Sequence, residues 1–177
     1  MTVAATQLGP AGAAPLVFVS YSWDSDPHMA WVREEFTNGL RSRGVDAVVD
    51  VHATNYGDLL DDFMEGLAGR CNHIAVICTP NYATRARGDI GGVGYEKALI
   101  KKFLTSTSPT RRVVPILREG DASSVPPFLG SRIWVDMRSD SNTEILLDEL
   151  TALFYGQQIY RAAPLEEPPD WVKKLVS

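Results

Sequence analysis

Cysteine and histidine are scarce in this chain of 177 residues. Its two cysteines are Cys71 and Cys78, and its three histidines, His28, His52 and His73, are scattered along the sequence. Zinc sites and redox-active dithiols need close spacings such as C-x-x-C, which do not occur here. We therefore expect no metal site. We expect Cys78, which ends an apolar run, to be a buried reduced thiol.

A basic excess, a long apolar run and a glycine-rich phosphate motif are also missing. The net charge is −5, which argues against direct nucleic-acid binding through phosphate contacts. No apolar run reaches the roughly 18 residues of a membrane span, and residues 1–14 do not have the pattern of a secretory signal. We therefore expect a cytoplasmic protein without membrane contacts. The cluster Gly91-Gly92-Val93-Gly94 does not fit G-x-G-x-x-G, and neither a P-loop nor a G-x-S-x-G elbow occurs.

Short apolar, β-branched runs alternate with segments of helical periodicity. Strands are expected at residues 16–19, 45–51, 74–78, 113–117 and 133–135. Helices are expected from a cap at Asp26 to a stop at Gly44, from Asp58 to about residue 67, at about 95–104, and around 146–154 before Gly156. Thr79-Pro80-Asn81 is expected to halt the third strand and lead into a glycine-bearing loop. Pro115 suggests an edge or a bulge in the fourth strand.

This alternation predicts an α/β fold, a three-layer flavodoxin-like sandwich. Its five-stranded parallel sheet has the order 2-1-3-4-5, with helices on both faces. Residues 15–156 would form this domain, after a flexible leader at 1–14. Residues 157–177 would be a proline-bearing tail or a linker to a possible further domain. In this strand order, ligands bind at the carboxyl ends of strands 1 and 3, beside residues 20–24 and 79–81.

Glu96 is the strongest candidate for a catalytic residue. It lies near the start of the helix expected after the third strand, so its carboxylate can point toward the cleft. A carboxylate beside a sugar ring stabilises an oxocarbenium-like transition state or acts as a nucleophile. The alternative is an exposed helix glutamate paired with Lys97.

Further candidate binding residues are expected around the same cleft, and each of them also has a purely structural explanation. Tyr21 and Trp23 can stack on a base or a pyridine ring, or cap the edge of the core. Asp50, at the end of the second strand, can hydrogen-bond a ribose or cap a loop. Residues 55–58 can form a gate or an interface, or a solvated turn.

Several segments between Pro15 and Gly156 together form a family pattern. They are Val17-Phe18-Val19-Ser20-Tyr21-Ser22-Trp23-Asp24, Gly44-Val45-Asp46 through Val49-Asp50, Ala75-Val76-Ile77-Cys78-Thr79-Pro80-Asn81-Tyr82, Gly91-Gly92-Val93-Gly94-Tyr95-Glu96-Lys97, and Pro126-Pro127-Phe128-Leu129 before Ile133-Trp134-Val135-Asp136. This pattern resembles a bacterial Toll/interleukin-receptor (TIR) domain, near the SEFIR-like branch. Asn55, Tyr56, Gly57 and Asp58 stand in the place of its BB loop, an assembly interface.

The resemblance implies an NAD glycohydrolase, which cleaves the nicotinamide–ribose bond to give nicotinamide and ADP-ribose or a cyclic form. NAD is then a substrate, and no cofactor or metal is needed. Glu96 would be the catalytic carboxylate. The substrate-binding cleft would be lined by Ser20, Tyr21, Ser22 and Trp23, with Asp50 and Tyr95 as neighbours.

The resemblance also implies activation by self-assembly with other TIR domains, as in an anti-phage defence or signalling effector. A sensor domain in the same chain or in a partner protein would start that assembly. Two alternatives stay open at this stage. One is a non-catalytic TIR/SEFIR interaction module that acts through residues 55–58, and the other is a nucleoside deoxyribosyltransferase-like enzyme.

Overall fold

The computed structural model describes residues 13–49, 66, 70–88, 100–101, 103–105, 112–157, 160 and 163–175. Several expected features lie outside these residues. They are Asp50, the loop 55–58, most of the helix expected at 58–67, and the segment that contains Tyr95 and Glu96.

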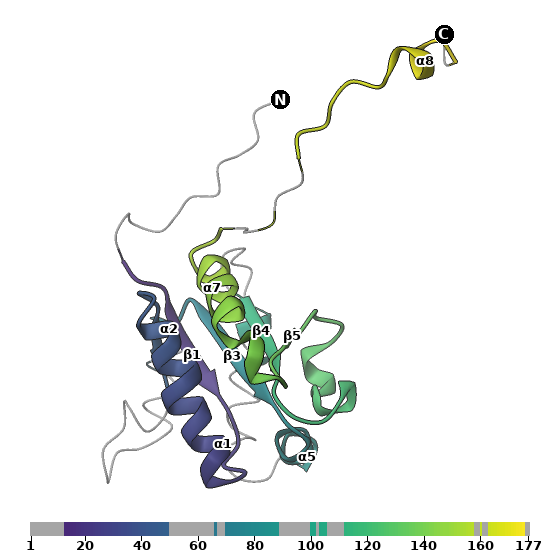
Figure 1. Ribbon diagram of the computed structural model, residues 1–177. Helices are drawn as coiled ribbons and strands as arrows, with labels where there is room; N and C mark the ends of the chain where they lie inside the picture. Colours follow the sequence, from purple (N-terminus) through teal and green to yellow (C-terminus); the bar gives the residue numbers. More distant parts are fainter. Residues whose placement is uncertain are drawn as a thin grey trace.

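The sheet has the predicted topology. Five strands, β1 (Leu16–Ser20), β2 (Asp46–Val48), β3 (His73–Cys78), β4 (Arg112–Leu117) and β5 (Val135–Asp136), lie in the order β2-β1-β3-β4-β5 (Figure 1). Every neighbouring pair is parallel. This is the flavodoxin-like α/β arrangement predicted from the alternation of apolar runs, and it puts the carboxyl ends of β1 and β3 side by side.

The helices and short turns connect these strands or follow the last of them. The first helical stretch consists of α1 (Asp26–Ala30), the π-helical segment η1 (Trp31–Thr37) and α2 (Asn38–Arg41). The others are α5 (Pro80–Gly88), the 3-10 turns η2 (Ala122–Ser124), η3 (Pro127–Leu129) and η4 (Asp140–Asn142), then α7 (Thr143–Phe154) and α8 (Asp170–Lys173). Within the described residues, no helix is long and apolar enough to cross a membrane.

Two apolar clusters cover the two faces of the sheet. Because side chains alternate along a strand, Val17 and Val19 join one cluster and Phe18 joins the other. The first cluster is closed by the stretch α1–α2 and by α7, which lie next to each other in front of the sheet (Figure 1). The second includes Tyr82 of α5 and Ile100. Helices on both faces give the predicted three layers.

The helix α5 corrects one prediction. A loop was expected after Thr79-Pro80-Asn81, but a helix begins at Pro80. Proline favours the first turn of a helix, where its missing N–H is not needed. The Thr79 hydroxyl accepts the Tyr82 backbone N–H at 3.1 Å and caps that turn.

Other element boundaries also differ from the prediction. The first helix is capped by Ser25 rather than Asp26: the Ser25 side chain accepts the His28 N–H at 3.3 Å. The second strand covers 46–48 rather than 45–51. The helix α7 and the positive φ of Gly156, 71°, agree with the expected end of the last helix.

The fifth strand begins two residues later than predicted. Ile133 and Trp134 are 93% and 40% exposed, and the strand is Val135–Asp136. It pairs only with the last two residues of β4, Ile116 and Leu117, so the apolar residues before it have no strand partner among the described residues. The same short pairing explains why Pro115 is tolerated in β4, since β5 does not reach it.

Candidate functional site

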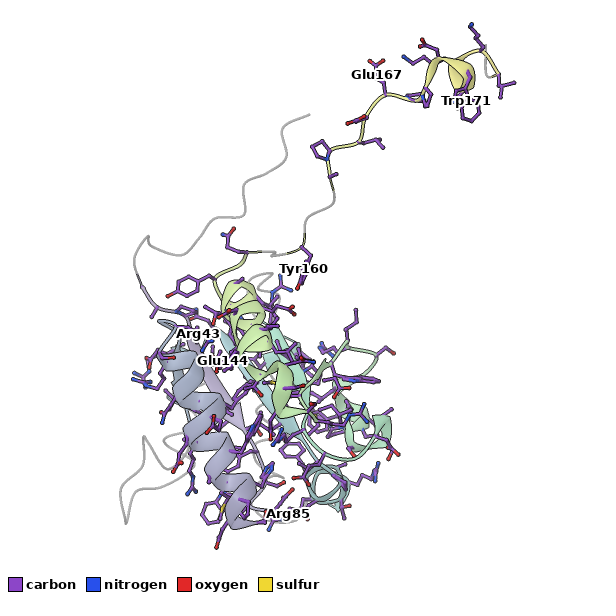
Figure 2. The ribbon with its side chains drawn as sticks, in the orientation of Figure 1. Arg43, Arg85, Glu144, Tyr160, Glu167 and Trp171 are labelled. Carbon is purple, nitrogen blue, oxygen red and sulfur yellow. The ribbon has the colours of Figure 1, made fainter. Side chains whose placement is uncertain are left out.

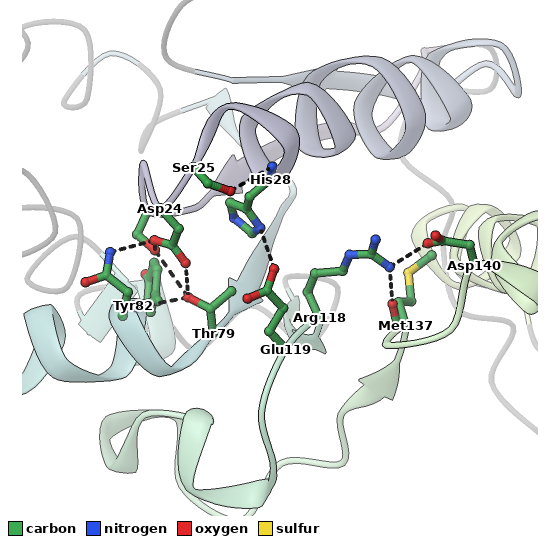
Figure 3. A network of polar contacts seen from close by, with 11 residues as sticks. Asp24, Ser25, His28, Thr79, Tyr82, Arg118, Glu119, Met137 and Asp140 are labelled. Carbon is green, nitrogen blue, oxygen red and sulfur yellow. Dashed lines mark hydrogen bonds and ion pairs between the residues drawn. The ribbon is translucent and has the colours of Figure 1, made fainter.

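A hydrogen-bonded cluster lies where β1 and β3 end. Asp24 is at its centre: one carboxylate oxygen accepts the Thr79 hydroxyl at 2.6 Å, and the other accepts the Asn81 side-chain amide at 2.6 Å (Figure 3). The Ser22 hydroxyl also donates to Asp24. The loop after β1 is therefore fixed to the start of α5 by side chains at the carboxyl edge of the sheet.

A second link ties the strand end itself to α5. The hydroxyls of Ser20 and Tyr82 are 2.7 Å apart, and both residues are fully buried. A buried hydroxyl needs a partner, because its desolvation is otherwise uncompensated. Ser20 therefore serves the packing of β1 against α5 in this structure.

The four predicted substrate-binding residues at the end of β1 differ in their exposure to solvent. Ser20 and Ser22 are 0% exposed and Tyr21 is 4% exposed, whereas Trp23 is 59% exposed. The Tyr21 ring belongs to the first apolar cluster, and its hydroxyl accepts two hydrogen bonds from Arg33, at 3.2 and 3.1 Å. Of the two aromatic candidates, Tyr21 caps the core edge and Trp23 is open to contact.

The remaining predicted site residues lie outside the described residues. These are the catalytic candidate Glu96, the neighbours Asp50 and Tyr95, and the interface loop Asn55, Tyr56, Gly57 and Asp58. Their placement in the site stays a prediction.

His28 is a member of this edge that sequence reasoning missed. Its side chain lies in the first turn of α1, is 4% exposed, and points between the Asp24 cluster and the chain that leaves β4 (Figure 3). Neither ring nitrogen has a hydrogen-bond partner within the described residues. Its Nδ1 is 3.7 Å from a carboxylate oxygen of Glu119. The signal was present in the sequence, because His28 precedes the buried Val32 and Phe36 at intervals of four, on the inward face of the helix.

Burial controls the charge of His28. Desolvation lowers the pKa of its imidazole below the usual 6.5, although Asp24 and Glu119 act to raise it; Arg118 acts to lower it. The imidazole is therefore neutral at pH 7. In that form it offers one N–H donor and one acceptor lone pair.

Arg118 forms the far side of this edge, and its Nη1 atom makes two hydrogen bonds. Its guanidinium donates to the Met137 carbonyl and to an Asp140 carboxylate oxygen, each at 2.7 Å (Figure 3). It also lies 4.0 Å from the centroid of the Trp31 ring. These contacts hold the chain after β4 against the first helix and leave Glu119 beside His28.

The described part of the site is thus built from hydroxyls, the Asn81 amide, two carboxylates, a neutral imidazole and the guanidinium of Arg118. Within the described residues, no group of three or more His, Cys, Asp or Glu side chains could hold a metal ion. Such a set suits a polar, uncharged group such as a sugar better than it suits a phosphate, because Asp24 and Glu119 repel anions.

Comparison with solved structures supports the same fold. A prokaryotic SEFIR domain is 26% identical, with a TM-score of 0.62, over 88% of this chain and 98% of that one. The TIR domain of the Toll-related receptor TRR-2 from Hydra magnipapillata is 15% identical, with a TM-score of 0.58, over 78% of this chain and 96% of that one. A diflavin flavoprotein from Nostoc sp. is 18% identical, with a TM-score of 0.51, over 81% and 93%.

Comparison of the sequence with family models identifies the family. No curated protein matches the chain. The model described as "TIR domain" matches residues 17–151, from the start of β1 into the last turn of α7. The chain therefore belongs to the TIR domain family.

Proposed function

We propose that this TIR domain is an NAD glycohydrolase. The observation that supports the proposal most is the polar cluster of Ser22, Asp24 and Thr79 at the carboxyl ends of β1 and β3. These strands flank the point where the strand order reverses, which is the place where open α/β sheets bind nucleotides. The exposed indole of Trp23 beside this cluster offers a stacking surface for a flat ring.

In the proposed reaction, the bond between the ribose anomeric carbon and the nicotinamide nitrogen breaks. The bonding electron pair leaves with nicotinamide, which becomes a neutral ring, and positive charge develops on the ribose. Glu96 is the proposed carboxylate that stabilises this charge. Water then adds to the anomeric carbon and releases a proton, giving ADP-ribose; attack by a group of the same molecule gives the cyclic form instead.

The proposal includes activation by assembly. We assign residues 55–58 to the contact with a neighbouring copy, so turnover should rise more steeply than in proportion to protein concentration. The assay therefore has to use concentrated protein as well as dilute protein.

The test compares the unmodified chain with Glu96→Gln, using chromatography to follow nicotinamide release from NAD. We expect Glu96→Gln to lower turnover by about 10²–10³-fold, the usual loss when one electrostatic group of an active site is removed. Glu35→Gln is the matched control, because Glu35 is an exposed glutamate on the π-helical segment, and it should keep normal turnover. Undiminished turnover in assembled Glu96→Gln protein would remove Glu96 from the mechanism.

A non-catalytic interaction module is the second candidate. Two observations favour it: the 26% identity to a SEFIR domain over nearly its whole length, and the burial of Ser20, Tyr21 and Ser22. This candidate predicts self-association in light scattering, weakened by Tyr56→Ala, with no nicotinamide release at any protein concentration. Nicotinamide release that depends on Glu96 would reject it.

A further inference from the structure

The His28 side chain is a buried polar group whose hydrogen-bonding capacity is unused within the described residues. It is 4% exposed, and neither Nδ1 nor Nε2 has a partner there. Buried polar atoms in native proteins are nearly always satisfied, so an exception calls for a physical explanation such as a missing ligand. The His28 backbone is fixed in the first turn of α1 by its N–H bond to Ser25.

The groups around His28 determine which chemical groups a ligand needs in order to bind there. On the β4 side, Nδ1 and the nearest Glu119 oxygen are 3.7 Å apart, which is too far for a hydrogen bond between them. The Glu119 side chain is 55% exposed whereas the His28 side chain is 1% exposed, so a ligand approaches this pair from the Glu119 side. On the β1 side lies Asp24, and on the β4 side lies Arg118, the other two charged groups that act on the imidazole.

The two carboxylates near His28 disfavour an anion. Arg118 already donates to Asp140 and Met137 through Nη1, and Asp24 and Glu119 would repel a phosphate. A neutral imidazole donates and accepts, and the carboxylate beside it accepts. Two hydroxyls on adjacent carbons complement this pair, since one can bond the imidazole nitrogen while its neighbour donates to the carboxylate.

We propose that His28 and Glu119 together bind a vicinal diol, namely a ribose of the nucleotide substrate. This inference rests on the proposed NAD glycohydrolase function. It assigns a positioning role to His28 in the first turn of α1 and to Glu119, two residues after the end of β4. A ribose held there lies at the carboxyl edge of the sheet, where that function requires it.

The experiment uses ¹³C,¹⁵N-labelled protein and follows the His28 ring resonances, assigned through the backbone. The probes are methyl ribofuranoside, an uncharged sugar with the vicinal diol, and methyl 2-deoxyribofuranoside, which lacks it. We expect methyl ribofuranoside to shift the His28 signals at concentrations about tenfold lower, as expected for one charge-assisted hydrogen bond. The His73 ring, buried elsewhere in the fold, serves as the internal control and should not respond.

A variant supplies the second measurement. Glu119→Gln should weaken binding of methyl ribofuranoside on the order of tenfold, and Glu35→Gln should leave it unchanged. Equal responses to the two sugars, no response of His28, or unweakened binding by Glu119→Gln would each overturn the diol site.

The outcome is independent of the test of catalysis. If nicotinamide release depends on Glu96 while His28 ignores both sugars, the diol site fails and the proposed function stands. If His28 prefers the diol-bearing sugar and no NAD is cleaved, the function fails and the site remains a sugar-binding site.

Discussion

His73 should make the stability of this protein depend on pH. It is the first residue of β3 and is 5% exposed, and its Nε2 lies 3.0 Å from the Phe154 carbonyl oxygen at the end of α7. In this geometry Nε2–H donates to the carbonyl. Nδ1 has no hydrogen-bond partner within the described residues, so a proton placed on it would be buried without compensation.

The magnitude follows from the pKa. Desolvation lowers the pKa of His73 from 6.5 to about 4; the Phe154 carbonyl acts to raise it, and Arg112 acts to lower it. Between those two pH values the unfolded chain binds a proton that the native protein does not bind. The stabilisation is therefore complete above pH 6.5 and is lost as the pH falls toward 4. At about 1.4 kcal/mol per pH unit, the loss is about 3 kcal/mol.

The assay is urea unfolding of the unmodified protein and of His73→Gln, from about pH 7.5 down to about pH 4. The glutamine amide can still donate to the Phe154 carbonyl but does not titrate. His28 and the surface carboxylates titrate in both proteins, so their contributions cancel in the difference between the two unfolding free energies. That difference should shrink by about 3 kcal/mol over the interval. Parallel stability curves would refute the reasoning.

Two further expectations concern a glycine and a thiol. Gly120→Ala should cost about 1–3 kcal/mol of stability and more than Gly156→Ala: both glycines have positive φ, 82° and 71°, but a Cβ at Gly120 would also sit 2.9 Å from Pro80 Cγ, whereas one at Gly156 meets nothing within 4 Å. Equal losses in urea unfolding would contradict this. In a Cys71→Ser background, Cys78 should resist iodoacetamide in the native protein and react in urea, because burial raises the pKa of its thiol to about 12; equal rates in the two states would be the contrary result.

The sheet was predictable because its signal is local and repeated. Each strand is a short apolar run, and residues such as Val17, Phe18 and Val19 are buried whichever face they point to, as expected for a parallel sheet covered on both sides. The strand order then followed from general rules of chain connection rather than from particular residues.

Two predictions of element boundaries were wrong because residue type alone does not show which structural role a residue takes. Proline ends a strand, but it also begins a helix, and at Pro80 the second role applies because Thr79 supplies the cap. Ile133 and Trp134 have the composition of a strand, yet they lie outside the pairing, because the parallel register would place Trp134 opposite Pro115, which has no N–H to donate. Amino-acid composition alone does not show which residues of the partner strand are available for pairing.

The sequence predicts the position of the candidate site, but not the direction of its side chains. The strand order predicts a binding cleft at the end of β1, whereas the inward turn of Ser22 depends on Asp24 and Thr79, which are brought together only by the fold. His28 was missed because a histidine on a buried helical face is usually part of the core; its importance depends on the nearby Glu119, which is distant in sequence.

The segment that follows β1 therefore contains both buried residues that hold the fold together and one exposed aromatic residue. Ser20, Tyr21 and Ser22 are buried and hydrogen-bonded, so replacing them disturbs the junction of β1 with α5 or the first helix before it affects any ligand. Loss of NAD turnover on changing Ser22 would thus report on folding as much as on binding. Trp23 is 59% exposed, and its indole can be removed without opening the core. Trp23 and Glu119 are the exposed residues among those proposed to contact a ligand at this edge, so changes at these two residues separate binding from folding.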